Sequence, residues 1–163
     1  MKLYTMKNPP LYPDFIDDAD AELIALRSLP ESQWHIRGET AALALFHEMA
    51  ERVPAYNDFL QQHGIDHRTV KTIEDFQQVP LIDKDNYLRA YPREQLCWDG
   101  DFKNHGWVLS TTSGSTGKPY YFPRQEMQDK YYALVAEMYL RENFEIDQKS
   151  TLYIVGFSMG AWI

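Results

Sequence analysis

The chain has 163 residues, the length of one ordinary domain, and its 44% apolar and 14% aromatic residues argue against disorder. Its formal net charge is −8 and no cluster of lysine and arginine stands out, so a nucleic acid is not expected as the main partner. The single cysteine, Cys97, excludes a disulfide within the chain and a zinc site built on a CxxC pair.

The two ends of the chain bear on its location and completeness. The first ten residues lack the continuous apolar run of a signal peptide, and no segment reaches the apolar length that spans a bilayer. We therefore expect a cytoplasmic protein without a membrane partner. Residues 152–163 form an apolar run resembling a buried strand, whereas natural termini are usually polar. We therefore expect that the chain is truncated at 163.

Residues 1–105 are predicted to form a mostly helical N-terminal region. Short helices bounded by proline, glycine and capping residues are predicted at about 18–29, 40–53, 55–63, 72–76 and 83–91. In the second of these, Leu43, Phe46, Ala50 and Val53 recur on one helical face. That face is expected to pack in a core, and Asp20 and Asp83 are expected to cap the first and last helices.

Residues 106–163 have a different pattern, which predicts the start of an α/β nucleotide-binding core. Strands are expected at 106–110, 120–122 and 152–157, and a helix at 124–143. The first two strands flank a hairpin-like turn. The order strand, helix, strand suggests a βαβ unit in a mostly parallel sheet. On the helix, the expected apolar face comprises Met127, Tyr131, Leu134, Val135 and Met138.

The loop at 110–119 carries the clearest chemical signal. It contains the run Thr112, Ser113, Gly114, Ser115, Thr116, Gly117, Lys118 and Pro119. Small residues let a backbone approach a bulky anion, and successive main-chain N–H groups form a concave donor site. Hydroxyl groups add donors and Lys118 adds a positive charge. This combination is suited to phosphoryl oxygens, whereas the simpler alternative is a hydroxyl-rich surface turn.

Two familiar nucleotide-binding patterns do not fit this loop. A Walker A motif needs four residues between its glycines and a Ser or Thr after the lysine. Here two residues separate Gly114 from Gly117, and Pro119 follows Lys118. The G-x-G-x-x-G pattern of dinucleotide-binding proteins is also absent. The loop therefore predicts a phosphate site of another kind.

Residues 109–119 resemble the phosphate-loop signature of the AMP-forming ligases, the acyl-CoA synthetase and adenylation-domain superfamily. The last position of that signature is usually Lys or Arg, and here it is Tyr120. The phenylacetate-CoA ligase-like branch often lacks this basic residue too. The spaced motifs at 53–56, 63–66, 79–85 and 91–92 are similar to the N-terminal motifs of that branch. The resemblance covers roughly residues 50–163.

The resemblance implies an ATP-dependent enzyme that uses Mg²⁺. A carboxylic acid, aryl or acyl, attacks the α-phosphorus of ATP, pyrophosphate leaves, and a thiol of coenzyme A or of a carrier protein then takes the acyl group. Because an anion attacks a polyanion, catalysis depends on positioning and charge stabilisation. On this basis the four hydroxyls of Thr112, Ser113, Ser115 and Thr116 donate to phosphate, Gly114 and Gly117 permit the turn, and Lys118 offsets charge or is simply solvated.

Other residues give weaker signals. Phe157 and Trp162 fall where relatives begin their acyl pocket, although aromatic residues after a buried strand more often belong to a core. His63 and His67 are four apart, but Gly64 between them breaks the helix that a two-histidine metal face would need. No metal ligand set or catalytic residue is assigned. Cys97 is interpreted as a buried thiol, not a nucleophile.

Three hypotheses follow from the sequence. The chain is a fragment of an AMP-forming ligase, a non-catalytic module that binds a nucleotide or another anion, or a structural helical domain whose loop is incidental. The other working parts of the ligase family lie downstream of its phosphate loop. Under the first hypothesis we therefore expect the chain to be catalytically silent by itself.

Overall fold

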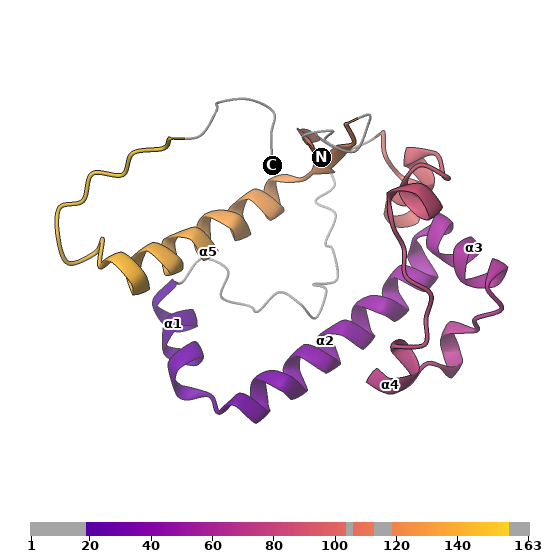
Figure 1. Ribbon diagram of the computed structural model, residues 1–163, viewed down its shortest axis with the longest axis horizontal. Coiled ribbons are helices and arrows are strands. Elements are labelled where there is room, and N and C mark those ends of the chain that lie inside the picture. Colours follow the sequence, from indigo (N-terminus) through magenta and orange to yellow (C-terminus); the bar gives the residue numbers. More distant parts are fainter. Residues whose placement is uncertain (1–18, 104–105, 113–118, 157–163) are drawn as a thin grey trace, which may run out of the picture. The chain divides into compact units, whose positions relative to one another are not determined.

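The computed structural model describes residues 19–103, 106–112 and 119–156 (Figure 1). These residues fall into two compact units. The first unit comprises residues 29–103 of the described chain. The second comprises residues 106–156 together with the N-terminal helix at 19–28. The second unit is thus built from two separated stretches of sequence, a grouping that the sequence pattern does not reveal.

The described residues of the first unit form helices joined by turns, with no strand among them. The helices are α2 (Glu31–Arg52), α3 (Pro54–Gln62), η1 (His67–Thr69), α4 (Ile73–Phe76), η2 (Lys84–Leu88), η3 (Arg93–Leu96) and η4 (Trp98–Gly100). The short helices predicted in this unit are confirmed, with two changes. The helix expected at 83–91 ends at Leu88, three residues early. Helix α2 begins directly after Pro30, nine residues before the expected start at Thr40. Pro30 is extended and lies at the N-cap, so it starts this helix as well as following the previous one.

The core of the first unit forms where α2 meets α3. Phe46, Ala50 and Val53 are buried, as the predicted helical face required, and Leu43 packs against them. Helix α3 contributes Tyr56, Phe59 and Leu60, all buried. The Phe46 ring meets the rings of Tyr56 and Phe76 edge to face, with centroids 6.1 and 5.4 Å apart. Burial of these apolar rings is the main stabilising contribution in this unit.

Side-chain caps define the ends of the short helices. Thr72 and Asp75 form a capping box at α4, in which the side chain of each residue accepts a hydrogen bond from the backbone N–H of the other residue. Asp83 caps η2, accepting from the backbone N–H groups of Asp85 and Asn86 at 2.7 Å. This confirms the expected role of Asp83. These caps satisfy donors that a helix of one turn cannot satisfy internally.

Helix α3 ends in a left-handed residue, Gly64, at φ +70°. The N–H of Ile65 donates to the carbonyl of Leu60 at 2.9 Å, and that of Gly64 donates to Gln61 at 3.0 Å. These two bonds are those of a Schellman motif, in which an apolar residue after the glycine packs back on the helix. Ile65 is that residue and packs against the core.

The second unit contains α1 (Ala19–Ser28), β1 (Val108–Thr111), β2 (Tyr121–Arg124) and α5 (Glu126–Phe144). Both predicted helices are confirmed to within two residues. Asp20 lies in the first turn of α1 and not at a cap position. The expected apolar face of α5 is only partly correct: Tyr131, Leu134 and Met138 are half-buried, whereas Met127 and Val135 are 43% and 61% exposed.

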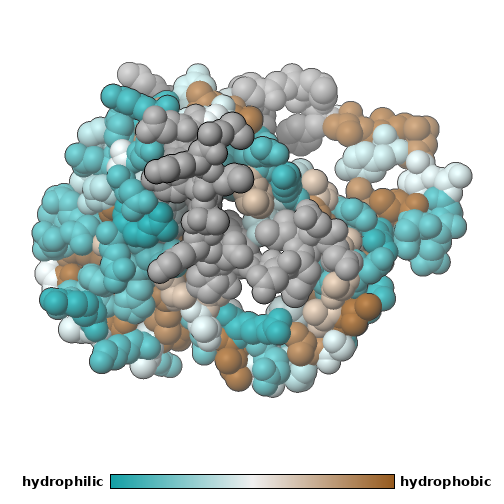
Figure 2. Space-filling model, turned by 180° about the vertical axis from the view of Figure 1, so that it is seen from behind, coloured by the Kyte–Doolittle hydropathy of each residue, from teal (hydrophilic) through white to brown (hydrophobic). Residues whose placement is uncertain are grey.

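The strand predicted at 152–157 is not present in the described residues 152–156. Leu152, Tyr153, Ile154 and Val155 are 84, 68, 78 and 62% exposed and belong to no helix or strand. Figure 2 shows brown, apolar side chains on the arm of the chain that follows α5. Within the described residues, the sheet is one antiparallel pair, so the parallel sheet remains a prediction.

Candidate functional site

The predicted phosphate loop connects β1 to β2. Strand β1 leads into Thr112, and Pro119 and Tyr120 lead into β2. The six residues between them, Ser113, Gly114, Ser115, Thr116, Gly117 and Lys118, lie outside the described residues. So do Phe157 and Trp162, the residues assigned to an acyl pocket. The candidate site is therefore described through the two strands that present the loop.

The two strands form the hairpin that the sequence predicted. They are antiparallel, and Val108, Leu109, Ser110 and Thr111 lie opposite Arg124, Pro123, Phe122 and Tyr121. In this register Thr112 lies opposite Tyr120, one step beyond the last strand pair. The loop therefore leaves and re-enters the sheet at one end of the hairpin.

Two hydrogen bonds between Thr112 and Tyr120 close this end of the hairpin. The N–H of Thr112 donates to the Tyr120 carbonyl at 3.0 Å. The N–H of Tyr120 donates to the Thr112 hydroxyl oxygen at 3.1 Å. The side chain of Thr112 thus takes the place of a backbone acceptor. As a result the two ends of the loop are fixed relative to each other.

The Thr112 hydroxyl can serve two partners at once. A hydroxyl oxygen accepts through its lone pairs and donates through its single O–H. Because the bond from Tyr120 uses only the oxygen, the O–H of Thr112 is chemically able to donate to a phosphate. This arrangement fits the donor role predicted for Thr112 and adds a second role in closing the hairpin. The sequence pattern did not predict the second role, because it depends on register.

The last two residues of β1, Ser110 and Thr111, have buried hydroxyl side chains and are not among the predicted site residues. Ser110 is 3% exposed and Thr111 is 8% exposed. The Thr111 hydroxyl donates to the carbonyl of Thr112 at 3.2 Å. This bond links the side chain of β1 to the backbone at the start of the loop. The sequence shows that Ser110 and Thr111 belong to a run of Ser and Thr residues, but it does not show that they are buried.

Tyr120 stands where the ligase signature usually has a basic residue. Its ring is half-buried and meets Phe122 edge to face, with centroids 4.9 Å apart. Arg124 does not replace the missing charge at that position. It lies four residues along β2, or about 13 Å at the rise of an antiparallel strand. Its Nη2 lies 3.5 Å from Asp129, so its charge is directed toward the start of α5.

Pro123 removes a hydrogen-bond donor from the outer edge of β2. The backbone bond between Thr112 and Tyr120 makes that pair a hydrogen-bonded one, and the classes alternate along the strands. Leu109 and Pro123 are therefore a non-hydrogen-bonded pair, so the nitrogen of Pro123 faces away from β1. A proline has no N–H to offer at that edge, which protects β2 against pairing with a further strand.

The other residues considered from sequence, two histidines and Cys97, lie in the first unit. His63 lies with its Nδ1 2.8 Å from the Phe59 carbonyl, while the His67 ring lies 5.9 Å from that of His47. Within the described ranges, no three His, Cys, Asp or Glu side chains gather as metal ligands. Burial, then the charges of Glu94 and Asp101, raise the pKa of the Cys97 thiol. A raised pKa disfavours the thiolate that a nucleophile needs.

Comparison with family models, with curated proteins and with solved structures gives no match to this chain. The resemblance to the AMP-forming ligases therefore rests on the motifs of the sequence. None of the helices in the described part of the chain is both long and apolar enough to span a bilayer.

Proposed function

We propose that this chain is part of an AMP-forming acid–thiol ligase of the phenylacetate-CoA ligase-like branch. Its activity is the ATP-dependent activation of an aryl or acyl carboxylic acid, followed by thioester formation with coenzyme A or a carrier-protein thiol. The observation that carries the proposal is the hairpin closed by Thr112 and Tyr120, because it presents a loop rich in glycine and hydroxyl groups from a fixed base.

The physical support lies in what a fixed base does for a phosphate site. Holding donors in place before the ligand arrives reduces the ordering that binding would otherwise require. In the proposal the phosphate oxygens are bound by backbone N–H groups of the loop and by the hydroxyls of Thr112, Ser113, Ser115 and Thr116. Gly114 and Gly117 allow the close approach of the backbone. Lys118 offsets the charge of the leaving pyrophosphate.

The proposal also assigns partners and a location. Mg²⁺, when bound with ATP, would neutralise part of the triphosphate charge, and coenzyme A would supply the accepting thiol. Neither these groups nor the carboxylic acid can be placed on the described residues. A cytoplasmic location belongs to the same proposal, because ATP and free thiols are found there and Cys97 is an unpaired thiol.

The test is ATP–pyrophosphate exchange that depends on a carboxylic acid, measured with the full-length protein. In the double variant Ser115→Ala, Thr116→Ala we expect the exchange rate to fall by about 100-fold or more, since loss of one donor in an anion hole has an effect of that order. The matched control, Ser32→Ala with Thr40→Ala, removes two exposed hydroxyls from α2 and should exchange at the wild-type rate.

Two outcomes would contradict the proposal. Exchange at the wild-type rate in the loop variant would show that the loop hydroxyls do not act on phosphate. Binding of pyrophosphate without any exchange, over a panel of aryl and acyl acids, would support the non-catalytic anion-binding module instead.

A further inference from the structure

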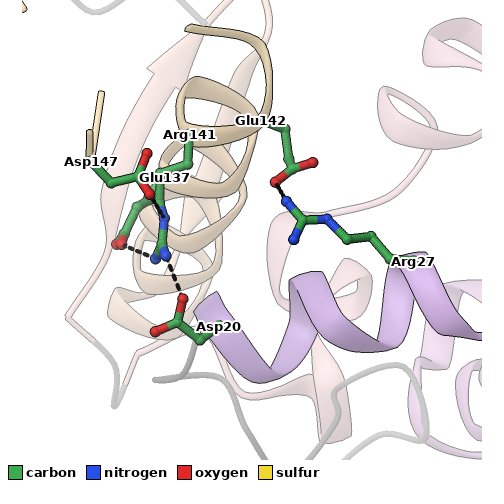
Figure 3. Close-up of polar contacts among 6 residues, drawn as sticks. All are labelled: Asp20, Arg27, Glu137, Arg141, Glu142 and Asp147. Carbon is green, nitrogen blue, oxygen red and sulfur yellow. Dashed lines mark hydrogen bonds and ion pairs between the residues drawn. The ribbon is translucent and has the colours of Figure 1, made fainter. Parts of the chain in front are cut away.

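Helix α1 pairs with α5 although 97 residues of sequence, 29–125, lie between them. An ion pair joins α1 to α5 at each end of α1 (Figure 3). Asp20, in the first turn of α1, accepts a hydrogen bond from Arg141 of α5. Arg27, in the last turn, donates to Glu142, the next residue of α5. The two ion pairs therefore hold α1 at both of its ends.

Arg141 lies at the centre of this contact. Its Nη1 lies 3.2 Å from Glu137, one turn back on α5, and its Nε lies 3.8 Å from Asp147 in the segment after the helix. With Asp20, three carboxylates from three segments surround one guanidinium, as Figure 3 shows. The hydrogen bond to Asp20 is the first cause of a raised pKa at Arg141. The guanidinium remains charged at any ordinary pH.

The apolar part of the contact is small. Ala19 and Leu23 are buried. The other large apolar residues of α1, Ile24 and Leu26, are 63% and 47% exposed. A helix of ten residues is marginal in water by itself, because an isolated helix needs about 12–15 residues to be stable. Helix α1 thus depends on docking, to which its buried Leu23 and the two ion pairs to α5 contribute.

We propose that α1, residues 19–28, is a releasable strap on α5, whose docking is controlled by the ion pairs of Arg141 and Arg27. Screening or removing these charges releases the strap, and the released segment loses its helix. Release also uncovers Arg141 on α5. The proposal concerns the fold of this chain and does not depend on the proposed ligase activity.

Amide hydrogen exchange of the complete 163-residue chain tests the strap. The readout is the set of amides at 23–28, because the first four N–H groups of a helix have no partner within it. In Arg141→Gln we expect these amides to exchange up to about fivefold faster, since Asp20 is the one partner of Arg141 on α1 and a single exposed ion pair accounts for up to about that factor. In the wild type, raising the salt concentration from 0.05 to 1 M should have a similar effect.

The control is Lys149→Gln, which removes an ion pair to Glu145 at 3.0 Å within one segment of the same unit. It should change exchange at 23–28 by less than about twofold. A charge reversal gives a second test. Arg27→Glu should speed amide hydrogen exchange at 23–28, and adding Glu142→Arg should restore protection of these amides. Unchanged exchange at 23–28 in Arg141→Gln and at high salt would overturn the proposal. The proposal would also be overturned if the double variant Arg27→Glu, Glu142→Arg did not regain protection at 23–28 while the amides of α5 stayed protected.

Discussion

Asp66 shows how a single side chain can organise a turn. Its carboxylate accepts from the backbone N–H of Arg68 at 3.0 Å and from the guanidinium of the same residue at 2.9 and 2.8 Å. The side-chain bond and then the backbone bond lower the pKa of Asp66 to about 2. Within the sequence motif at 63–66, Asp66 therefore has a local role as the cap of η1.

A titration of the Asp66 carboxyl by carbon NMR should therefore give a pKa of about 2. The folded pKa lies below the unfolded value of about 4, so the stabilising effect is complete above pH 4 and is lost as pH falls through 2. In Arg68→Gln the pKa should rise, though not fully, because the backbone N–H at position 68 still donates. Arg93→Gln, at an exposed arginine, is the control, and an unchanged Asp66 pKa in Arg68→Gln would contradict this account.

Burial gives a second prediction at the scale of single residues. Phe46 is 2% exposed, so Phe46→Ala should lower the free energy of unfolding by about 3–5 kcal/mol, measured by urea denaturation. Leu81 is 89% exposed, and Leu81→Ala should stay within about 0.5 kcal/mol of the wild type. Equal losses in the two variants would mean that the α2–α3 core is not where the structure places it.

At the scale of elements, the short helices were the most predictable part of the chain. Their boundaries depend on local chemistry, such as the Thr72 and Asp83 caps and the glycine after α3, and local chemistry is visible in sequence. The sequence predicts α2 only from residue 40, because residues 31–39 have no apolar face that would indicate a helix. The strand at 152–157 was predicted from its residue types alone, yet a strand also needs a neighbour to pair with.

Two glycines test the helix assignments with the same substitution. Gly64 has φ +70°, so Gly64→Ala should lower the free energy of unfolding by about 1 kcal/mol, since a left-handed alanine is strained. Gly38 lies inside α2, where an added Cβ meets nothing within 4 Å, so Gly38→Ala should raise it by about 0.5–1 kcal/mol. Thermal unfolding measures both, and a shift of the same sign in the two variants would contradict the assigned conformations.

At the scale of the whole molecule, the two units differ in how much they bury. The first has a continuous core of ten buried residues, whereas the described part of the second buries Ala19, Leu23, Ser110 and Thr111. Amides of α3 and of the C-terminal half of α2 should therefore exchange more slowly than those of α5 by at least about tenfold. Exchange mass spectrometry measures this, and slower exchange in α5 would show that the second unit has a core of its own.

The pairing of distant segments was the least predictable feature. Nothing in the sequence of α1 indicates that it docks on α5, because Asp20 and Arg27 read as ordinary surface charges until their partners are known. The hairpin, in contrast, was predicted from two short β-prone runs beside the loop. Its closure by the Thr112 hydroxyl could not be foreseen, since it requires the register that sets Thr112 opposite Tyr120.

The central claim is that the loop between Thr112 and Tyr120 binds phosphate, and a titration of the chain with pyrophosphate followed by amide NMR tests it most directly. We predict saturable shifts at the amides of residues 112–118, with those of α3 unchanged, and loss of these shifts in the variant Ser115→Ala, Thr116→Ala. Shifts that are absent from 112–118, or that persist unchanged in that variant, would contradict the claim.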